Sequence, residues 1–138
     1  MELPLDAEGL LPHRLPMRLV DRLLAIDGKN GTVETLVAAD CPLVDSGGTL
    51  EPIALIELIA QGYAALKGYL DRLEDKPVRQ GFLVGIKKLA CLESVQVGDL
   101  LKIDIKTLGE LEDFAVAEGQ IWCGDKMIAR GEIKVWIN

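Results

Sequence analysis

"LEPIALIELIAQGYAALKGY", residues 50–69, is the segment on which the fold depends. It predicts a helix that starts near Pro52, a residue tolerated in a first helical turn, and continues to about Leu70. Up to position 66, Glu57 and Gln61 are its only charged or amide side chains. A helix that is apolar almost all round is enclosed by the rest of the protein, so the sequence predicts a central helix.

The segments on either side of this helix predict β-strands. Apolar Leu101, Ile103 and Ile105 alternate with Lys102 and Asp104, as in a strand with one buried face. The predicted strands are 17–26, 32–38, 80–92, 100–107, 113–122 and 126–136, with "DGKNG" (27–31) as a hairpin turn between the first two. The sequence therefore predicts the α+β hotdog fold, a curved antiparallel sheet of five or six strands wrapped around one long central helix.

Length and composition limit the classes of protein to consider. A chain of 138 residues is near the commonest domain size, so we expect a single domain over residues 1–138. Hydrophobic residues make up 49% of the chain and aromatic residues only 4%, which predicts an aliphatic core. The net charge of -7 argues against nucleic acid as a partner, because the phosphate backbone attracts basic surfaces.

The three cysteines, Cys41, Cys91 and Cys123, are widely spaced and form no CxxC pair. We expect buried free thiols in a reducing cytosol, with no metal site. The N-terminal "MELPLDAEG" (1–9) is acidic where a signal peptide would be basic, so we expect a cytoplasmic protein. The apolar run 53–66 is too short to span a bilayer, and we expect no membrane partner.

Glu57 and Gln61 are the polar residues of the central helix that need a physical explanation. They are four positions apart and therefore share one face. A carboxylate on an enclosed helix is paired, protonated or lining a cavity, because its unpaired burial is costly. The residues alone leave two interpretations open: a structural hydrogen-bond network or a functional acid.

His13, the only histidine, lies in "LLPHRLPMRLVDRLL" (10–24). Its imidazole either ties a turn in this proline-flanked segment or takes part in chemistry. The neighbouring Arg14 and Arg18 are equally consistent with solvated charges.

Three motifs in this order resemble the 3-hydroxyacyl-[acyl carrier protein] dehydratases. "LLPHRLPMRLVDRLL" (10–24) resembles the family's opening segment, which leads into a first strand. "ALIELIAQGYAAL" (54–66) resembles the central-helix motif, and "GFLVGIKKLACLESVQVGDLLKIDI" (81–105) resembles the strand that lines the acyl channel. The resemblance covers most of the chain and implies a hotdog fold.

The resemblance also implies roles for individual residues. It implies that Glu57 is catalytic and that Gln61, Phe82, Val84 and Gly85 contact substrate, with no cofactor. The family's tunnels form between two subunits, and sheet edges need covering, so we expect a homodimer or an oligomer of dimers.

The segment before the helix departs from the family pattern. The family carries its catalytic histidine there in a GHFPxxPxxPG loop, whereas this chain has "CPLVDSGGTLEP" (41–52), a loop that looks shortened. Pro52 stands where the family has a glycine whose amide serves the thioester oxygen, and proline has no N–H. The pattern is closer to a divergent, aryl-polyene-type branch. His13 is the only imidazole left as a candidate base, although the family does not use that position for catalysis.

Three functions remain open at this point. The first is a dehydratase of 3-hydroxyacyl thioesters in fatty-acid or polyene-type lipid synthesis, with Glu57 held protonated as the acid and His13 as the candidate base. The second is a hotdog acyl thioesterase, in which the helix carboxylate activates water. The third is a non-catalytic acyl-binding partner subunit.

A dehydratase of this type implies an acyl thioester on acyl carrier protein as its partner. Carrier proteins are acidic, so docking on this acidic chain requires a local basic patch. The candidates are Arg14, Arg18, Arg79, Lys87 and Lys88, which lie in or near the segments that resemble the tunnel mouth.

Overall fold

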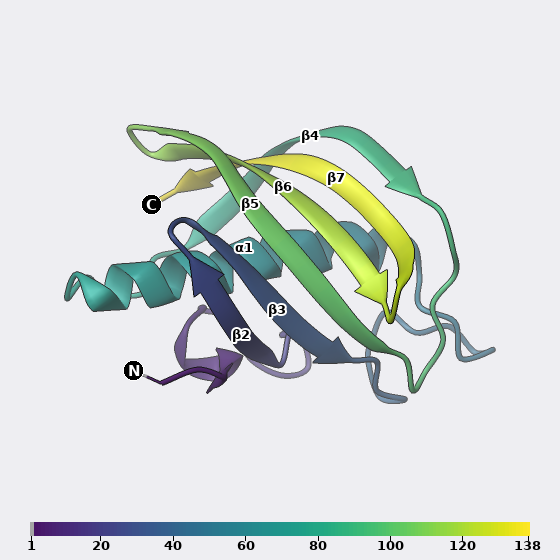
Figure 1. The fold of residues 1–138 in the computed structure, drawn as a ribbon. Helices are drawn as coiled ribbons and strands as arrows, with labels where there is room; N and C mark the ends of the chain where they lie inside the picture. Colours follow the sequence, from purple (N-terminus) through teal and green to yellow (C-terminus); the bar gives the residue numbers. More distant parts are fainter. Residues whose placement is uncertain (1) are drawn as a thin grey trace.

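One long helix, α1 (Ile53–Leu73), lies in the concave face of a curved sheet (Figure 1). The structure is a computed structural model that describes residues 2–138. The predicted central helix is confirmed, and buried residues occur on most of its perimeter. By length and composition α1 could cross a membrane, but 67% of its most apolar stretch is buried inside the protein.

The sheet is antiparallel throughout and has the strand order β1-β2-β3-β5-β6-β7-β4. This arrangement of sheet and helix confirms the predicted hotdog fold, with seven strands instead of five or six. The additional strand, β1, is a two-residue pairing that precedes a short 3-10 helix (Ala7–Gly9). The strands are β1 (Leu5–Asp6), β2 (Arg22–Asp27), β3 (Asn30–Leu36), β4 (Gly81–Cys91), β5 (Leu100–Leu111), β6 (Phe114–Cys123) and β7 (Lys126–Ile137).

The first strand begins later than the sequence predicts. The pattern predicted a strand from residue 17, whereas β2 begins at Arg22. The reason is that the Leu19 N–H and the Met17 carbonyl bond to the Gln61 side chain on α1, and the Leu19 carbonyl accepts from the Thr35 hydroxyl, so side chains take the place of a strand partner. Periodicity cannot distinguish a segment whose backbone bonds to side chains from one that pairs in a sheet.

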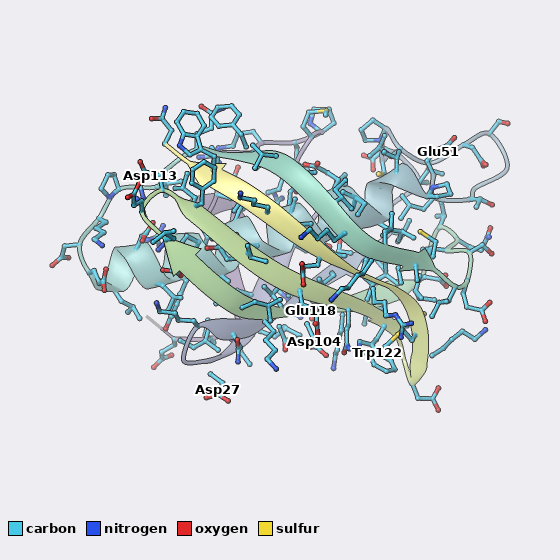
Figure 2. All side chains as sticks on the ribbon, turned by 90° about the horizontal axis from the view of Figure 1, so that it is seen from above. Asp27, Glu51, Asp104, Asp113, Glu118 and Trp122 are labelled. Carbon is cyan, nitrogen blue, oxygen red and sulfur yellow. The ribbon has the colours of Figure 1, made fainter. Side chains whose placement is uncertain are left out.

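The two faces of the sheet differ as the alternation predicts. Leu101, Ile103 and Ile105 are at most 2% exposed and form part of the aliphatic core against α1. Figure 2 looks onto the outer face, where Asp104 and Glu118 project away from the helix. Among residues 2–138, core packing is therefore built from the concave face of the sheet.

Two glycines let backbone and side chains approach α1 more closely than any other residue would. A Cβ at Gly119 of β6 would lie 2.5 Å from the Ile59 side chain. A Cβ at Gly68 of α1 would lie 1.7 Å from the backbone oxygen of Leu10, which is itself fully buried. Gly68 thereby allows the N-terminal segment to cross directly over the helix.

The cysteines differ from the prediction in burial. All three are free, but Cys91 is exposed and Cys41 and Cys123 are half-buried. Cys91 and Cys123 are the last residues of strands, and Cys41 lies in the loop before α1, so none reaches the central layer of the core.

β4 is a free edge of the sheet with large apolar side chains on its surface. It pairs only with β7 and is the last strand in the order. Five of its apolar residues are between 39% and 52% exposed: Phe82, Leu83, Val84, Ile86 and Leu89. An apolar edge strand of this kind is a surface for pairing with another chain.

We expect Gly68→Ala to lower the free energy of unfolding by about 1–3 kcal/mol, the usual cost of overpacking. Alanine favours the helix, but its methyl group collides with a backbone oxygen that moves only together with the N-terminal segment. Chemical denaturation measures the change. Gly109→Ala is the control, because a Cβ there has no neighbour within 4 Å. Equal stability of the two variants would contradict the close approach at Gly68.

Candidate active site

A cavity of about 220 Å³ runs along one side of α1. Its walls are the helix, the beginning of β4, the end of β7 and the N-terminal segment at Pro12 and His13. Polar groups lie at both ends of the cavity, with Glu57 and His13 at one and Asp71 and Arg79 at the other.

The structure brings His13 and Glu57 together. His13 Nε2 lies 3.8 Å from Glu57 Oε1, and the two side chains are 32% and 39% exposed. They come from segments 44 positions apart, so only the crossing of the N-terminal segment over α1 makes this pair. The sequence predicts a carboxyl enclosed in apolar surroundings, whereas the Glu57 side chain is partly open to solvent.

The imidazole of His13 does not tie the turn around it. The Arg14 side chain ties this turn, because its Nη1 donates to the carbonyls of Glu8, Leu11 and His13 at 2.8–3.0 Å. His13 Nδ1 is buried and has no hydrogen-bond partner among residues 2–138. Among the described residues, the polar group that this ring contacts is therefore the Glu57 carboxyl.

Gln61 holds Glu57 and the N-terminal segment in place. Its side chain is 1% exposed. Its Oε1 accepts the Leu19 N–H at 2.7 Å, and its Nε2 donates to the Met17 carbonyl at 2.8 Å and to Glu57 Oε1 at 2.9 Å. Gln61 is absent from the cavity wall, so its contact with the site passes through Glu57.

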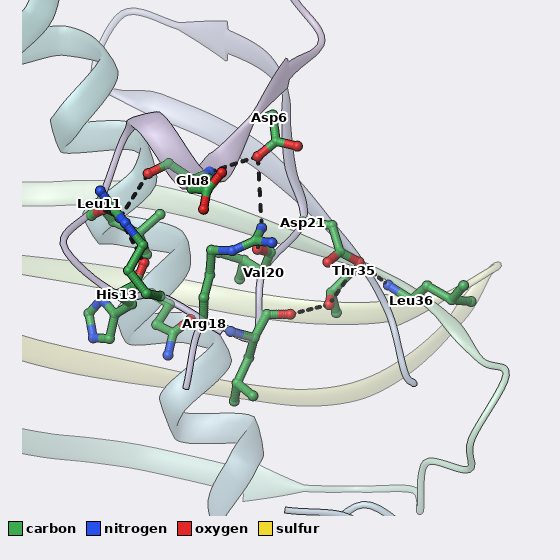
Figure 3. A network of polar contacts seen from close by, with 12 residues as sticks. Asp6, Glu8, Leu11, His13, Arg18, Val20, Asp21, Thr35 and Leu36 are labelled. Atoms are coloured by element: carbon green, nitrogen blue, oxygen red, sulfur yellow. Dashed lines mark hydrogen bonds and ion pairs between the residues drawn. The ribbon is translucent and has the colours of Figure 1, made fainter. Parts of the chain in front are cut away.

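Further bonds fix the segment between His13 and β2 (Figure 3). The Thr35 hydroxyl donates to the Leu19 carbonyl, and Asp21 Oδ2 accepts the Leu36 N–H at 2.7 Å. Arg18 donates to the Val20 carbonyl at 2.9 Å. The segment that carries His13 is therefore bonded on both sides, to α1 and to β3.

A buried ion cluster closes the other end of the cavity. Asp71 is 2% exposed, and its carboxylate is bound by Arg79 at 3.1–3.2 Å and by Lys67 at 3.4 Å. A buried carboxylate needs such partners, so this cluster fixes the end of α1 against the chain that leads into β4.

The predicted channel residues on β4 are only partly in the cavity wall. Phe82 is among the cavity-lining residues, and its ring stacks on Trp136, which is not in the wall, with 5.6 Å between centroids. Leu83 also lines it and was missed, whereas Val84 and Gly85 are not in the wall. The register of β4 on β7 shifts between Leu83 and Gly85, which turns the strand out of the simple alternation.

The five basic residues predicted to bind a partner lie in different places. Arg14 and Arg18 are bonded within the N-terminal segment, and the Arg18 side chain is only 10% exposed. Arg79 is engaged with Asp71, as described above. Lys87 and Lys88 are exposed on β4, so these two are the cations of the set best placed to meet another molecule.

The loop before α1 is folded without an imidazole. Asp45 Oδ1 accepts the N–H groups of Gly47 and Thr49 at 2.9 and 3.0 Å, and Leu50 bridges to Val44. Pro52 caps the helix with no side-chain hydrogen bond. Within residues 2–138, no group of three or more His, Cys, Asp or Glu side chains gathers as in a metal site.

Sequence comparison finds relatives among the FabZ 3-hydroxyacyl-[acyl-carrier-protein] dehydratases. The enzyme of Chlamydia trachomatis serovar D is 30% identical over 139 residues, which cover 93% of this chain and 87% of the relative. The enzyme of Clostridioides difficile strain 630 is 25% identical over 130 residues, covering 93% and 92% of the two chains.

Structural comparison matches the dehydratase heterocomplex ApeI:P from Xenorhabdus doucetiae. The TM-score is 0.91 at 23% identity, and the match covers 97% of this chain and 91% of the other, which establishes a common fold. The family model of the ApeP dehydratases matches residues 5–138. With this match over nearly its full length, the chain belongs to the ApeP-like dehydratase family.

Proposed function

We propose that this protein removes water from 3-hydroxyacyl thioesters, with Glu57 as the acid and His13 as the base. His13 takes the proton from C2, and the electrons of that C–H bond form the double bond between C2 and C3. The C3–O bond breaks, and the hydroxyl leaves as water with a proton from Glu57. Proton transfer from His13 to Glu57 then restores the starting state.

The observation that carries this proposal is the contact of His13 with Glu57 in one cavity. Dehydration acts on two adjacent carbons, so the acid and the base must lie within a few ångströms of each other, as these groups do at 3.8 Å. Glu57 Oε1 accepts a hydrogen bond from Gln61 Nε2. Because Gln61 and His13 both contact Oε1, we assign the transferred proton to Oε2.

One assay separates this function from its two alternatives. The protein is incubated with a 3-hydroxyacyl thioester of acyl carrier protein, and the products are measured by mass spectrometry. Loss of water supports the dehydratase, release of the free acid identifies a thioesterase, and no reaction identifies a non-catalytic acyl-binding subunit. Hydration of the 2-enoyl thioester, the reverse reaction, is the matching control.

We expect Glu57→Gln and His13→Ala each to lower turnover by at least ~100-fold while the fold is retained. Glutamine keeps the shape of Glu57 and loses its proton, and the His13 ring makes no structural hydrogen bond that its removal would break. Turnover and melting temperature are measured on the same samples.

The double variant tests whether the two residues act as one unit. For an acid–base pair, Glu57→Gln/His13→Ala loses little more activity than the more damaging single variant. If His13→Ala changes only the melting temperature, His13 is structural, and a base from a partner subunit must be sought.

The exposed edge of β4 supports assembly with a second copy of the chain. Its apolar side chains and its unpaired backbone groups are the features that strand pairing covers. We therefore expect sedimentation at micromolar concentration to give a homodimer. A stable monomer that dimerises only with another hotdog chain would contradict this and would favour a heterocomplex, the state of ApeI:P.

Lys87 and Lys88 support the docking of an acidic carrier protein on this acidic chain. We expect Lys87→Glu/Lys88→Glu to weaken carrier-protein binding, and more strongly at low salt, because salt screens exposed charges. Affinity is measured by calorimetry, and sedimentation of the same sample verifies that assembly is unchanged. Reversal of two exposed cations of the N-terminal half, Arg22 and Lys29, is the charge-matched control. Equal affinity of the two charge-reversed variants would remove Lys87 and Lys88 from the docking site.

A further inference from the structure

The hydroxyl of Tyr63 is a buried polar group without a partner. Tyr63 is 3% exposed, and its Oη makes no hydrogen bond to any of residues 2–138. An unpaired buried hydroxyl is unfavourable by about 1–3 kcal/mol, and native structures rarely leave one. Tyr63 lines the same cavity as Glu57 and His13, so a ligand that fills the cavity contacts this residue next to its unpaired hydroxyl.

The phenol is protonated over the whole working range of pH. Burial raises the pKa of Tyr63, and the carboxylates of Glu110 and Asp71 raise it further. A protonated phenol offers one O–H donor and also accepts hydrogen bonds. It can therefore pair with a carbonyl, an amide or a hydroxyl.

The neighbouring charged groups are already engaged with one another. Both Asp71 oxygens are bound by Arg79, and Lys67 also reaches this carboxylate. The cluster has one net positive charge and closes the cavity beyond Tyr63. This end of the cavity is therefore polar.

The cavity wall between Glu57 and Tyr63 fits a thin apolar chain. The two residues are six positions apart, which is about 9 Å along a helix axis. On the helix side, the wall carries Ala60, with Phe82 and Leu83 opposite. A ligand with its reacting carbons at Glu57 thus passes a narrow apolar region before it meets the polar end.

We propose that the Tyr63 hydroxyl binds a second polar group of the substrate, a hydroxyl, carbonyl or amide separated from the reacting carbons by an apolar spacer. This inference rests on the proposed function and adds a specificity-determining residue to it. The polar group belongs either to the far end of the acyl chain or to the pantetheine arm of the carrier. Both sources present the same hydrogen-bonding chemistry to Tyr63.

Tyr63→Phe is tested with three 3-hydroxyacyl thioesters. The first carries a plain alkyl chain on acyl carrier protein, the second has the same length with a hydroxyl at its far end, and the third carries the alkyl chain on N-acetylcysteamine. A roughly tenfold loss of kcat/KM only with the second assigns Tyr63 to the acyl end. An equal loss with the first two, and none with the third, assigns it to the pantetheine arm.

Unchanged kcat/KM for all three substrates would overturn the proposal. The melting temperature of Tyr63→Phe should equal or exceed that of the unmodified protein, because an unpaired buried hydroxyl is removed. Tyr69→Phe, on the same helix and outside the cavity wall, is the control and should leave substrate preference unchanged.

Binding of the 2-enoyl products separates this subsite from the dehydratase activity. Calorimetry measures that binding without turnover. A Tyr63-dependent affinity in a protein that eliminates no water would retain the subsite and reject the dehydratase. Turnover with no dependence on Tyr63 in rate or affinity would retain the dehydratase and reject the subsite.

Discussion

The hydrogen bonds of the buried Gln61 amide are the constraint on which the arrangement of the site depends. A side chain that is 1% exposed cannot leave its amide unpaired, and Gln61 finds its partners at Leu19, Met17 and Glu57. One side chain thereby fixes the N-terminal segment against α1 and orients the carboxyl beside it. Gly68 makes the same crossing sterically possible, since its missing side chain leaves room for the backbone of Leu10.

This crossing brings an imidazole next to Glu57, whereas the loop before the helix has no histidine. The segment over α1 carries His13 to within 3.8 Å of Glu57. The sheet provides the remaining walls, because only its concave face carries the aliphatic core. The cavity is thus built from three parts: the helix that carries Glu57, the N-terminal segment that carries His13, and strand ends that close it.

Much of the fold follows from local patterns in the chain. An all-round apolar helix and six alternating segments predicted the hotdog fold, and the helix and five of these strands lie within a few residues of their predicted bounds. Local patterns failed at residues 17–21, where Met17 and Leu19 bond to a helix side chain instead of a strand. Val84 and Gly85, which the family resemblance assigned to substrate contact, lie outside this cavity wall, beside a register shift of β4. Long-range hydrogen bonds and register shifts have no signature in local periodicity.

For the site, the residue types and the family motifs identified Glu57, Gln61 and His13 as the candidates. A carboxyl and an amide on an apolar helix need an explanation, and so does the only imidazole in the chain. Whether His13 meets Glu57 depended on the tertiary structure, since that contact spans 44 positions and is formed by the packing of the N-terminal segment. The same holds for Tyr63. In the sequence its hydroxyl is a polar exception on an apolar helix, and only the tertiary structure shows that it is buried without a partner among residues 2–138. Burial and hydrogen bonding are properties of neighbours that are distant in the chain.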